Sequence, residues 1–493
     1  MKRHIHPLLI SVCLAVLFCG CATRNAEKVR RDHADDFQSS LQEETAQVLS
    51  RYTNALTVDD CIAIARERSL KLSAARLTER VARIDRDAAF SVFLPQVSYE
   101  YQSVNLSEKA LKKFGAEPTE SQDQDVRMST VEISMPVFAP NAWLMYASAR
   151  RGADLQKIAR QRAEQMLDVQ TAGLFYQYAA AADRLDSTRR RLESAAALLK
   201  ESTALRDAGY LLDADCQKVV TLESSRKQEL SAVDREVQLA RARLLEALNL
   251  WPLADLSIDR ASVALLDPIR KADEPWTIDR IVSRPVEDWL FEAMTSRLEL
   301  FAGDRTIDLR KNEILRAIAL FLPNLYGFAN FYTTSDSYTV NDQYWGSGLQ
   351  GTLSAFVGFR DVNAYRSART QLKQAYVDRE ETAMAVMVQV VEARKSVFDA
   401  KEQLTVARNA ADAARLTFES VKAKHEAGTV GFSDYLEAMS AHEAAQAGLS
   451  GAEYACSMAL YVFRDVIGSS KENEHEKDSD SDSHPGRPAP DLV

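Results

Sequence analysis

The chain of 493 residues contains the same order of segments twice. Leu56–Leu72 (LTVDDCIAIARERSLKL) is matched 228 positions later by Arg284–Leu300 (RPVEDWLFEAMTSRLEL). At the same offset, Phe93–Tyr101 (FLPQVSYEY) is matched by Phe321–Ala329 (FLPNLYGFA). A repeat of this length predicts two structural units, each of which needs its neighbours to bury its apolar faces.

A third matching pair of segments ends two long stretches without proline. Ala208–Asp215 (AGYLLDAD) is matched 219 positions later by Ala427–Asp434 (AGTVGFSD), with the glycine and the last aspartate in register. No proline occurs in residues 141–251 or 324–484, so long helices are permitted there. Glycine can adopt a left-handed backbone conformation, which predicts that each helix stops at this tip.

Both proline-free stretches carry small or apolar residues that step alternately by four and three, the pattern of helices that supercoil on a partner. The second-copy series is Val386, Val390, Ala393, Val397, Ala400, Leu404, Ala407, Ala411, Ala414, Phe418 and Val421. The first-copy series is Leu167, Thr171, Leu174, Tyr178, Ala181, Leu185, Thr188, Leu192, Ala195, Leu199 and Ser202. We therefore predict outgoing helices over about 141–206 and 361–426, and returning helices over about 213–250 and 433–467.

The residues before each long helix change to a period of two. Val97, Tyr99 and Tyr101 alternate with polar residues, and Val131–Met135 alternates in the same way. A weaker alternation over 326–332 sets Tyr326, Phe328 and Tyr332 on one side and Gly327, Ala329 and Phe331 on the other. With a flanking segment at 349–353, it predicts a second β-hairpin. Four strands cannot close a membrane barrel, which needs about eight or more. If these strands enter a membrane, several copies must assemble; the alternative is a small soluble sheet that caps a helical bundle.

The N-terminus predicts export. Lys2 and Arg3 precede an apolar run at 8–18, which is too short to span a bilayer and reads as a signal-peptide core. Small residues before Cys21 resemble a bacterial lipoprotein signal, which predicts cleavage before Cys21 and a lipid on its sulfur. The alternative is a signal cut elsewhere, with an incidental cysteine.

Composition and motifs argue against several other classes of protein. The net charge of −10 disfavours a nucleic-acid partner. Cys61, Cys216 and Cys456 are an odd set at unrelated spacings, so no disulfide framework is predicted. The sequence contains no Walker loop, nucleophile elbow, HExxH motif or paired CxxC, so we predict neither an enzyme nor a metal or cofactor site.

The LTVDDCIAIARE segment, the FLPQVSYEY strand, Met135–Phe138 and the two glycine-acid tips resemble the TolC-type outer-membrane efflux family over about 56–468. The resemblance implies a mainly α fold with a β-barrel part. The fold has two tandem repeats, and each repeat is a β-hairpin plus a long coiled-coil helical hairpin. Three copies are expected to form a trimer with a twelve-stranded outer-membrane β-barrel and a twelve-helix periplasmic α-barrel. It also implies an exit channel for substrates that a periplasmic adaptor and an inner-membrane pump deliver, in an outer-membrane factor lipoprotein of a Gram-negative-type bacterium.

The expected divisions follow from the repeat and from this resemblance. They are a signal peptide (1–20), a lipid-anchored linker (21–55), the first repeat (56–252), an equatorial linker between the repeats (253–283), the second repeat (284–468) and a disordered acidic tail (469–493).

The resemblance also assigns roles at the hairpin tips. Asp434 and Glu437 match positions that face the axis at the periplasmic constriction, where carboxylates attract cations. Asp215 matches a position that latches neighbouring tips through a basic partner, but the partner position here is Val430. Adaptor contacts are expected at Gly209, Tyr210, Leu211, Gly428 and Thr429, and Tyr210 and Leu211 are expected to form an exposed apolar pair at the turn.

Each of these assignments has a simpler alternative. Acids early in a helix favour its N-terminal dipole, and glycines at a turn stop a helix without any partner. For the whole chain, the alternative function is a structural coiled-coil lipoprotein that acts as a spacer or adhesin without transport. The sequence does not identify the transported substrate, the pump or the adaptor, and it does not distinguish drug efflux from protein secretion or an open from a closed resting state.

Overall fold

The computed structural model describes residues 26–52, 55–108, 110–114, 117–260, 277–353 and 357–468. The expected signal peptide, Cys21 and the acidic tail lie outside these residues. The described chain forms two compact units, which are considered separately below.

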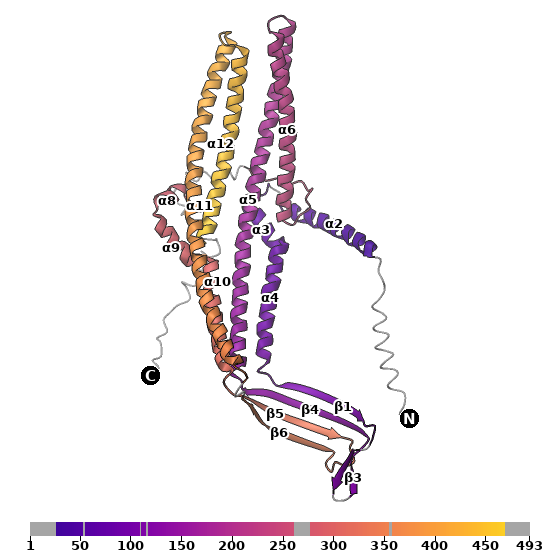
Figure 1. Cartoon of the computed structure of the whole chain (residues 1–493). Helices are drawn as coiled ribbons and strands as arrows, with labels where there is room; N and C mark the ends of the chain where they lie inside the picture. Colours follow the sequence, from indigo (N-terminus) through magenta and orange to yellow (C-terminus); the bar gives the residue numbers. More distant parts are fainter. Residues whose placement is uncertain are drawn as a thin grey trace. The chain divides into compact units, whose positions relative to one another are not determined.

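The two long helices are close to the predicted ranges. α5 (Pro140–Asp207, 68 residues) and α6 (Asp213–Ala247) form the first helical hairpin. α11 (Arg360–Glu426, 67 residues) and α12 (Phe432–Ile467) form the second (Figure 1). No residue of either predicted seam is exposed in the subunit, and the polar members of the first seam are fully buried. The prediction of two coiled-coil hairpins is confirmed.

The first unit contains the halves of both hairpins that carry the tips, together with the N-terminal helices α2 (Ala26–Ser50) and α3 (Val58–Arg68). α2 is held to this unit near its C-terminal end, where the Thr45 hydroxyl accepts a hydrogen bond of 2.8 Å from the backbone N–H of Trp251. α3 follows, and its Thr57–Asp60 pair caps the first turn. The sequence was expected to form a linker up to residue 55, so α2 gives most of that linker a regular structure.

The second unit contains a four-stranded antiparallel sheet in the order β1-β4-β5-β6 (Figure 1). These strands are Gln96–Asn105, Asp125–Phe138, Asn324–Thr334 and Gln343–Thr352. β1–β4 and β5–β6 are the two predicted hairpins, and Pro95 and Pro323 directly precede β1 and β5. Prolines are tolerated at strand entrances because they lack only an N–H that is not needed there.

One strand pair was not predicted. β2 (Ala110–Phe114) and β3 (Glu117–Gln122) form a separate two-stranded sheet within the polar connection from β1 to β4. Its base is tied to the connection between β5 and β6, because the Ser337 N–H donates a hydrogen bond of 2.6 Å to the Asp123 carboxylate. The segment lacks a period-two pattern, so its sequence indicated only a loop.

Helices in the second unit follow the order of the strands. α4 (Leu70–Ser91) leads into β1 and contacts α5 through the Glu79–Arg160 ion pair of 2.8 Å. α10 (Leu298–Ala319) leads into β5 and contacts α5 through Arg162–Glu299 and α11 through Asp304–Arg379, both at 2.7 Å. The helix order α4-α5-α10-α11 therefore repeats the strand order β1-β4-β5-β6.

A small core joins the second repeat's short helices to the end of α12. α8 (Ile278–Ser283) and α9 (Val286–Ser296) precede α10, and Trp289 of α9 meets Phe463 edge to face at 5.2 Å. Arg297 is only 4% exposed and donates to the Val466 carbonyl, the Glu299 carboxylate and the Gln389 amide oxygen. These acceptors replace hydrogen bonds that the guanidinium loses with water when it is buried. Among the described helices, none combines the length and the apolar character that a membrane span requires.

Candidate functional site: hairpin tips and the groove between the hairpins

The two tips have the same backbone geometry. Gly209 and Gly428 have φ values of +76° and +70°, in the left-handed region. In the first tip the Tyr210 N–H donates to the Leu205 carbonyl, and in the second the Thr429 N–H donates to the Lys424 carbonyl, both at 2.9 Å. These bonds satisfy carbonyls that the helix end would otherwise leave open. The repeat therefore extends to the hydrogen bonds of its turns.

The exposed apolar pair at the first tip differs in one residue from the pair expected from the sequence. Tyr210 is 83% exposed, as an exposed turn residue should be, but Leu211 is half-buried. Its neighbour Leu212 is 71% exposed and precedes α6 as its N-cap. The exposed apolar pair of this tip is thus Tyr210 and Leu212 rather than Tyr210 and Leu211, because the chain turns after Leu211 to begin α6.

The expected acidic residues fall into two environments. Asp434 and Glu437 are exposed near the start of α12. Asp215 accepts a hydrogen bond of 2.9 Å from the Lys218 ammonium, which also donates to the Ser433 hydroxyl at 2.8 Å. Lys218 therefore links the two tips within one subunit, while the Val430 carbonyl contacts the His425 ring at 3.2 Å.

Aromatic rings of α11 and α12 pack together next to the second tip. His425 stacks on Tyr435 at 5.1 Å, and His442 stacks on Phe418 at 5.4 Å. Phe418 and Tyr435 pack against a core of Leu198, Val219 and Met439, which joins α5, α6 and α12. Burial raises the pKa of Tyr435, and the nearby Glu201, Glu426 and Glu443 add to this shift. The phenol therefore stays neutral and serves as a packing surface.

Three polar contacts connect α12 to the first hairpin. They start from Ser433, Glu443 and Tyr454, which are ten and eleven residues apart and thus about three helical turns from one another. Ser433 accepts from Lys218, Glu443 accepts from Arg226 at 3.0 Å, and the Tyr454 hydroxyl donates to Asp183. The spacing places all three contacts on one face of α12, so we call them the α12 ladder.

The middle contact of the α12 ladder belongs to a larger charged network. Arg226 also donates to Glu229 at 2.9 Å, and Arg191 of α5 lies 3.1 Å from Glu229. Desolvation opposes ionisation of Glu229, but hydrogen bonding by Arg226 and the charges of Arg191, Arg226 and Arg184 outweigh it and lower its pKa. Desolvation dominates at Glu443 and raises its pKa despite Arg226. Arg226 thus donates to two carboxylates whose pKa values are shifted in opposite directions.

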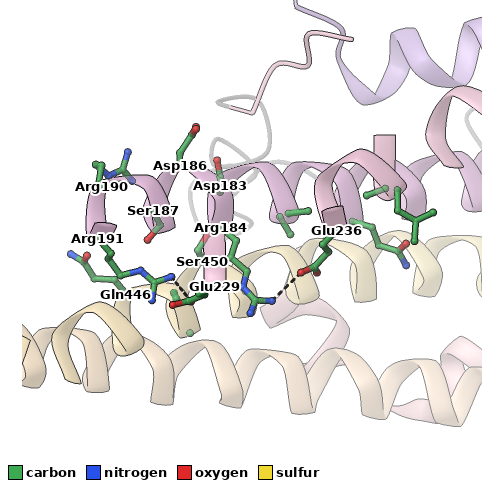
Figure 2. Close-up of a pocket in the computed structure, with 18 of the residues that line it drawn as sticks. Asp183, Arg184, Asp186, Ser187, Arg190, Arg191, Glu229, Glu236, Gln446 and Ser450 are labelled. Carbon is green, nitrogen blue, oxygen red and sulfur yellow. Dashed lines mark hydrogen bonds and ion pairs between the residues drawn. The ribbon is translucent and has the colours of Figure 1, made fainter. Parts of the chain in front are cut away.

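A cavity of about 900 Å³ lies between the middle and last contacts of the ladder (Figure 2). Besides Gln446, its α12 side consists of small residues, including Gly448 and Gly451. A Cβ added at either glycine would meet no atom within 4 Å. Figure 2 shows the charged pairs of its walls, Arg184–Glu236 at 3.3 Å and Arg191–Glu229 at 3.1 Å. The walls of the cavity combine apolar residues with acidic and basic side chains whose charges balance.

Neither the ladder nor the cavity was predicted. Arg226, Glu229, Glu443 and Tyr454 come from helices that are far apart in the sequence, and charged residues on long helices usually face water. Only the three-turn spacing along α12 could have suggested a shared face. The described residues contain no group of three or more His, Cys, Asp or Glu suited to a metal ion.

Comparison with known proteins assigns the chain to a family. The pattern of the family described as outer membrane efflux protein matches residues 61–250 and 289–469, which is one match for each repeat. The chain belongs to the outer membrane efflux protein family. This family consists of channel proteins and not of enzymes.

Relatives agree with this assignment over most of the chain. Outer membrane protein TolC of Escherichia coli (strain K12) is 22% identical over 419 residues, which cover 80% of each chain. The fold is similar to VceC of Vibrio cholerae (16% identity, TM-score 0.66, 83% of this chain and 96% of that one). It is also similar to the CmeC outer membrane channel of Campylobacter jejuni (13% identity, TM-score 0.68, 85% and 88%).

Proposed function

We propose that this outer membrane efflux protein is the exit duct of a tripartite export system and that it works as a ring of three copies. The observation that carries this proposal is the open sheet of the second unit. β1 and β6 each have a neighbour on one side only, so two rows of backbone N–H and C=O groups lack partners within the sheet. In hydrocarbon each such group costs several kcal/mol, so the edges of neighbouring copies must pair.

The two faces of the sheet favour a membrane barrel over a soluble cap. One row across the sheet contains Tyr99, Val131, Phe331 and Trp345, and an adjacent row on the other face contains Ser98, Glu132, Asn330 and Gly346. Apolar side chains on the first face are largely exposed in the subunit, with Tyr99 at 67% and Trp345 at 76%. A polar interior and an apolar exterior are the pattern of outer-membrane barrels.

The edge helices support the same assembly. α4 exposes Leu70, Leu77, Val81 and Ile84, and α11 exposes Val377, Met384, Val388 and Val391. Both sets step by seven, four and three residues, and their exposed fractions lie between 47% and 66%. Heptad-spaced apolar residues on both outer helices of the layer α4-α5-α10-α11 are seams that lack a partner in one subunit. A different edge on each side makes a heterologous interface, which forms a ring when the rotation between neighbouring copies closes on itself.

The partners and the anchor belong to this proposal. The exposed tips, with Gly209, Tyr210, Leu211, Gly428 and Thr429, would meet a periplasmic adaptor that connects the duct to an inner-membrane pump. Asp434 and Glu437 would line the periplasmic constriction, and Asp215 would act through Lys218 rather than through a basic residue at position 430. An acyl chain on Cys21 would add a lipid anchor in the outer membrane.

The test uses the full-length protein purified in detergent. We expect a mass of three copies, mobility that changes on heating, and ion conductance after insertion into planar bilayers. A monodisperse single copy without conductance would contradict the duct and favour a structural spacer. Mass spectrometry of the mature N-terminus tests the anchor, since Cys21→Ser should remove the mass of the lipid.

A further inference from the structure

Strand pairing fixes which side chains share the polar face of the sheet. One row across the four strands is Ser98, Glu132, Asn330 and Gly346, and the next on that face is Glu100, Thr130, Tyr332 and Tyr344. Contacts agree with this register. The Tyr332 and Tyr344 rings are 5.0 Å apart, and a Cβ added to Gly346 would lie 2.9 Å from Asn330 Oδ1.

The charge on this face has one sign. Among the residues of β1, β4, β5 and β6, Glu100 and Glu132 are the charged members of the polar face. The single basic residue of these strands, Arg127, pairs with Ser103 in a row that belongs to the opposite face. Both glutamates are exposed and lack an ion-pair partner among the described residues. They lie diagonally on neighbouring strands, since Glu132 faces Ser98 and Glu100 is two residues further along.

We propose that Glu100 and Glu132 are specificity-determining residues that make the membrane-level part of the duct favour cationic solutes. This inference rests on the proposed function, which makes the polar face the wall of a shared pore. Three copies would place six carboxylates around that pore, with no basic strand residue to neutralise them. Such a wall concentrates cations and repels anions. It is separate from the tip acids, because it lies in the sheet and not in the helical hairpins.

Salt concentration should control the effect. Fixed charges act over a Debye length of about 10 Å at 0.1 M salt and about 3 Å at 1 M. Carboxylates on the wall should therefore affect ions across much of the pore at low salt and only those near the wall at high salt. Selectivity that arises here must weaken strongly between these two conditions.

The experiment measures reversal potentials of single channels in planar bilayers under a KCl gradient. The double variant Glu100→Gln/Glu132→Gln keeps the side-chain shape and removes the charge. We expect its K⁺/Cl⁻ permeability ratio to fall by about twofold or more at 0.1 M salt, with little change at 1 M. Ser98→Lys, which places a cation opposite Glu132, should lower the ratio as well.

The control is Glu43→Gln on the exposed surface of α2, which changes one charge outside the sheet and should leave the ratio unchanged. Channels of normal conductance whose ratio is the same in wild type, the double variant and Ser98→Lys would overturn this inference and leave the duct intact. A wild-type protein that never conducts would instead overturn the proposed function. The two failures are therefore distinguishable.

Discussion

At the scale of single residues, glycines decide where the long helices can turn. Gly209 and Gly428 occupy a conformation that costs an L-residue with a side chain about 1–2 kcal/mol. Space is not the reason, because a Cβ at either position would meet no atom within 4 Å. The turn is therefore encoded by the backbone freedom of one residue in each repeat.

A matched pair of alanine substitutions tests this reasoning. Gly428→Ala should lower the free energy of unfolding by about 1 kcal/mol, since its φ is +70°. Gly448 lies inside α12, where an added Cβ would meet no atom within 4 Å. Gly448→Ala should therefore raise the free energy of unfolding by about 0.5–1 kcal/mol. Thermal unfolding followed by circular dichroism measures both. Shifts of the same sign at the two positions would contradict the assignment.

Asp434 is the tip residue whose charge we expect to matter most for transport. It is exposed in the first turn of α12, where three copies would bring three carboxylates together. Asp434→Ala should reduce both cation selectivity and block by multivalent cations in bilayer recordings. Asp213→Ala is the control, because it removes another exposed acid from the first turn of a returning helix, here α6. Unchanged selectivity in Asp434→Ala, or an equal loss in Asp213→Ala, would contradict a constriction at Asp434.

At the scale of elements, polar groups of α12 join the two hairpins in addition to the apolar core of Leu198, Val219 and Met439. Arg226 lies between Glu443 of the second hairpin and Glu229 of its own helix. All three side chains are less than a third exposed, so their charges are only partly screened by water. The opposite pKa shifts of the two glutamates predict that their loss will have different consequences.

Glu229→Gln and Glu443→Gln should therefore differ in stability. The pKa of Glu229 is lowered, so its stabilisation is present at neutral pH and is lost as pH falls through its folded-state pKa. Its replacement should cost about 1–3 kcal/mol at pH 7, with the difference from wild type vanishing in acid. The pKa of Glu443 is raised, so its charge is unfavourable in the fold and Glu443→Gln should be nearly neutral at pH 7. Denaturation across a pH series would refute this scheme if Glu443→Gln were the more damaging variant.

Local patterns predicted the elements well, and long-range contacts explain what was missed. The seam from Val386 to Val421 and the tip glycines located α11 to within about one residue at each end. The β2–β3 pair has no alternation, and its position depends on Asp123 and Ser337, which are 214 residues apart. The prediction for the faces of β5 was wrong, because the sequence pattern set Tyr326, Phe328 and Tyr332 on the apolar side. Pairing with β4 places Ala329 and Phe331 on the apolar face of Ile133 and Val131 instead.

The candidate site was predicted unevenly for the same reason. Turn glycines are visible in sequence because one residue type is required there, and both were found. Arg226–Glu443 and Tyr454–Asp183 join helices whose relative register no local pattern specifies. The absence of a basic residue at position 430 was visible in the sequence. The contact of Lys218 with Ser433 depends on the packing of α6 beside α12 and could not be predicted.

At the scale of the whole molecule, one wall must separate lipid from a water-filled pore. Adjacent residues of β5 point to opposite solvents in the proposed barrel, with Ala329 beside Ile133 and Asn330 beside Glu132. Polar or charged side chains are tolerated on one side and strongly disfavoured on the other. Charged substitutions at adjacent positions of β5 should therefore have very different effects in a membrane barrel, a difference not expected for a soluble sheet.

Ala329→Lys and Asn330→Lys provide this comparison. A lysine at the lipid face near the middle of a barrel costs about 2–4 kcal/mol, so Ala329→Lys should greatly reduce the yield of heat-modifiable trimer from outer membranes. Asn330→Lys should assemble normally, because it adds a cation beside Glu132. Equal yields from the two variants would contradict the proposed orientation of the sheet.

The two unlike edges of the subunit also have a genetic consequence. A copy damaged only at β6 still offers an intact β1, so it would join a growing ring and prevent the ring from closing. In a ring of three copies, the fraction of sound channels would be the cube of the fraction of sound copies. Mutations of that strand should accordingly be dominant in cells that also carry the normal gene, whereas mutations that unfold the chain before it reaches the ring should be recessive.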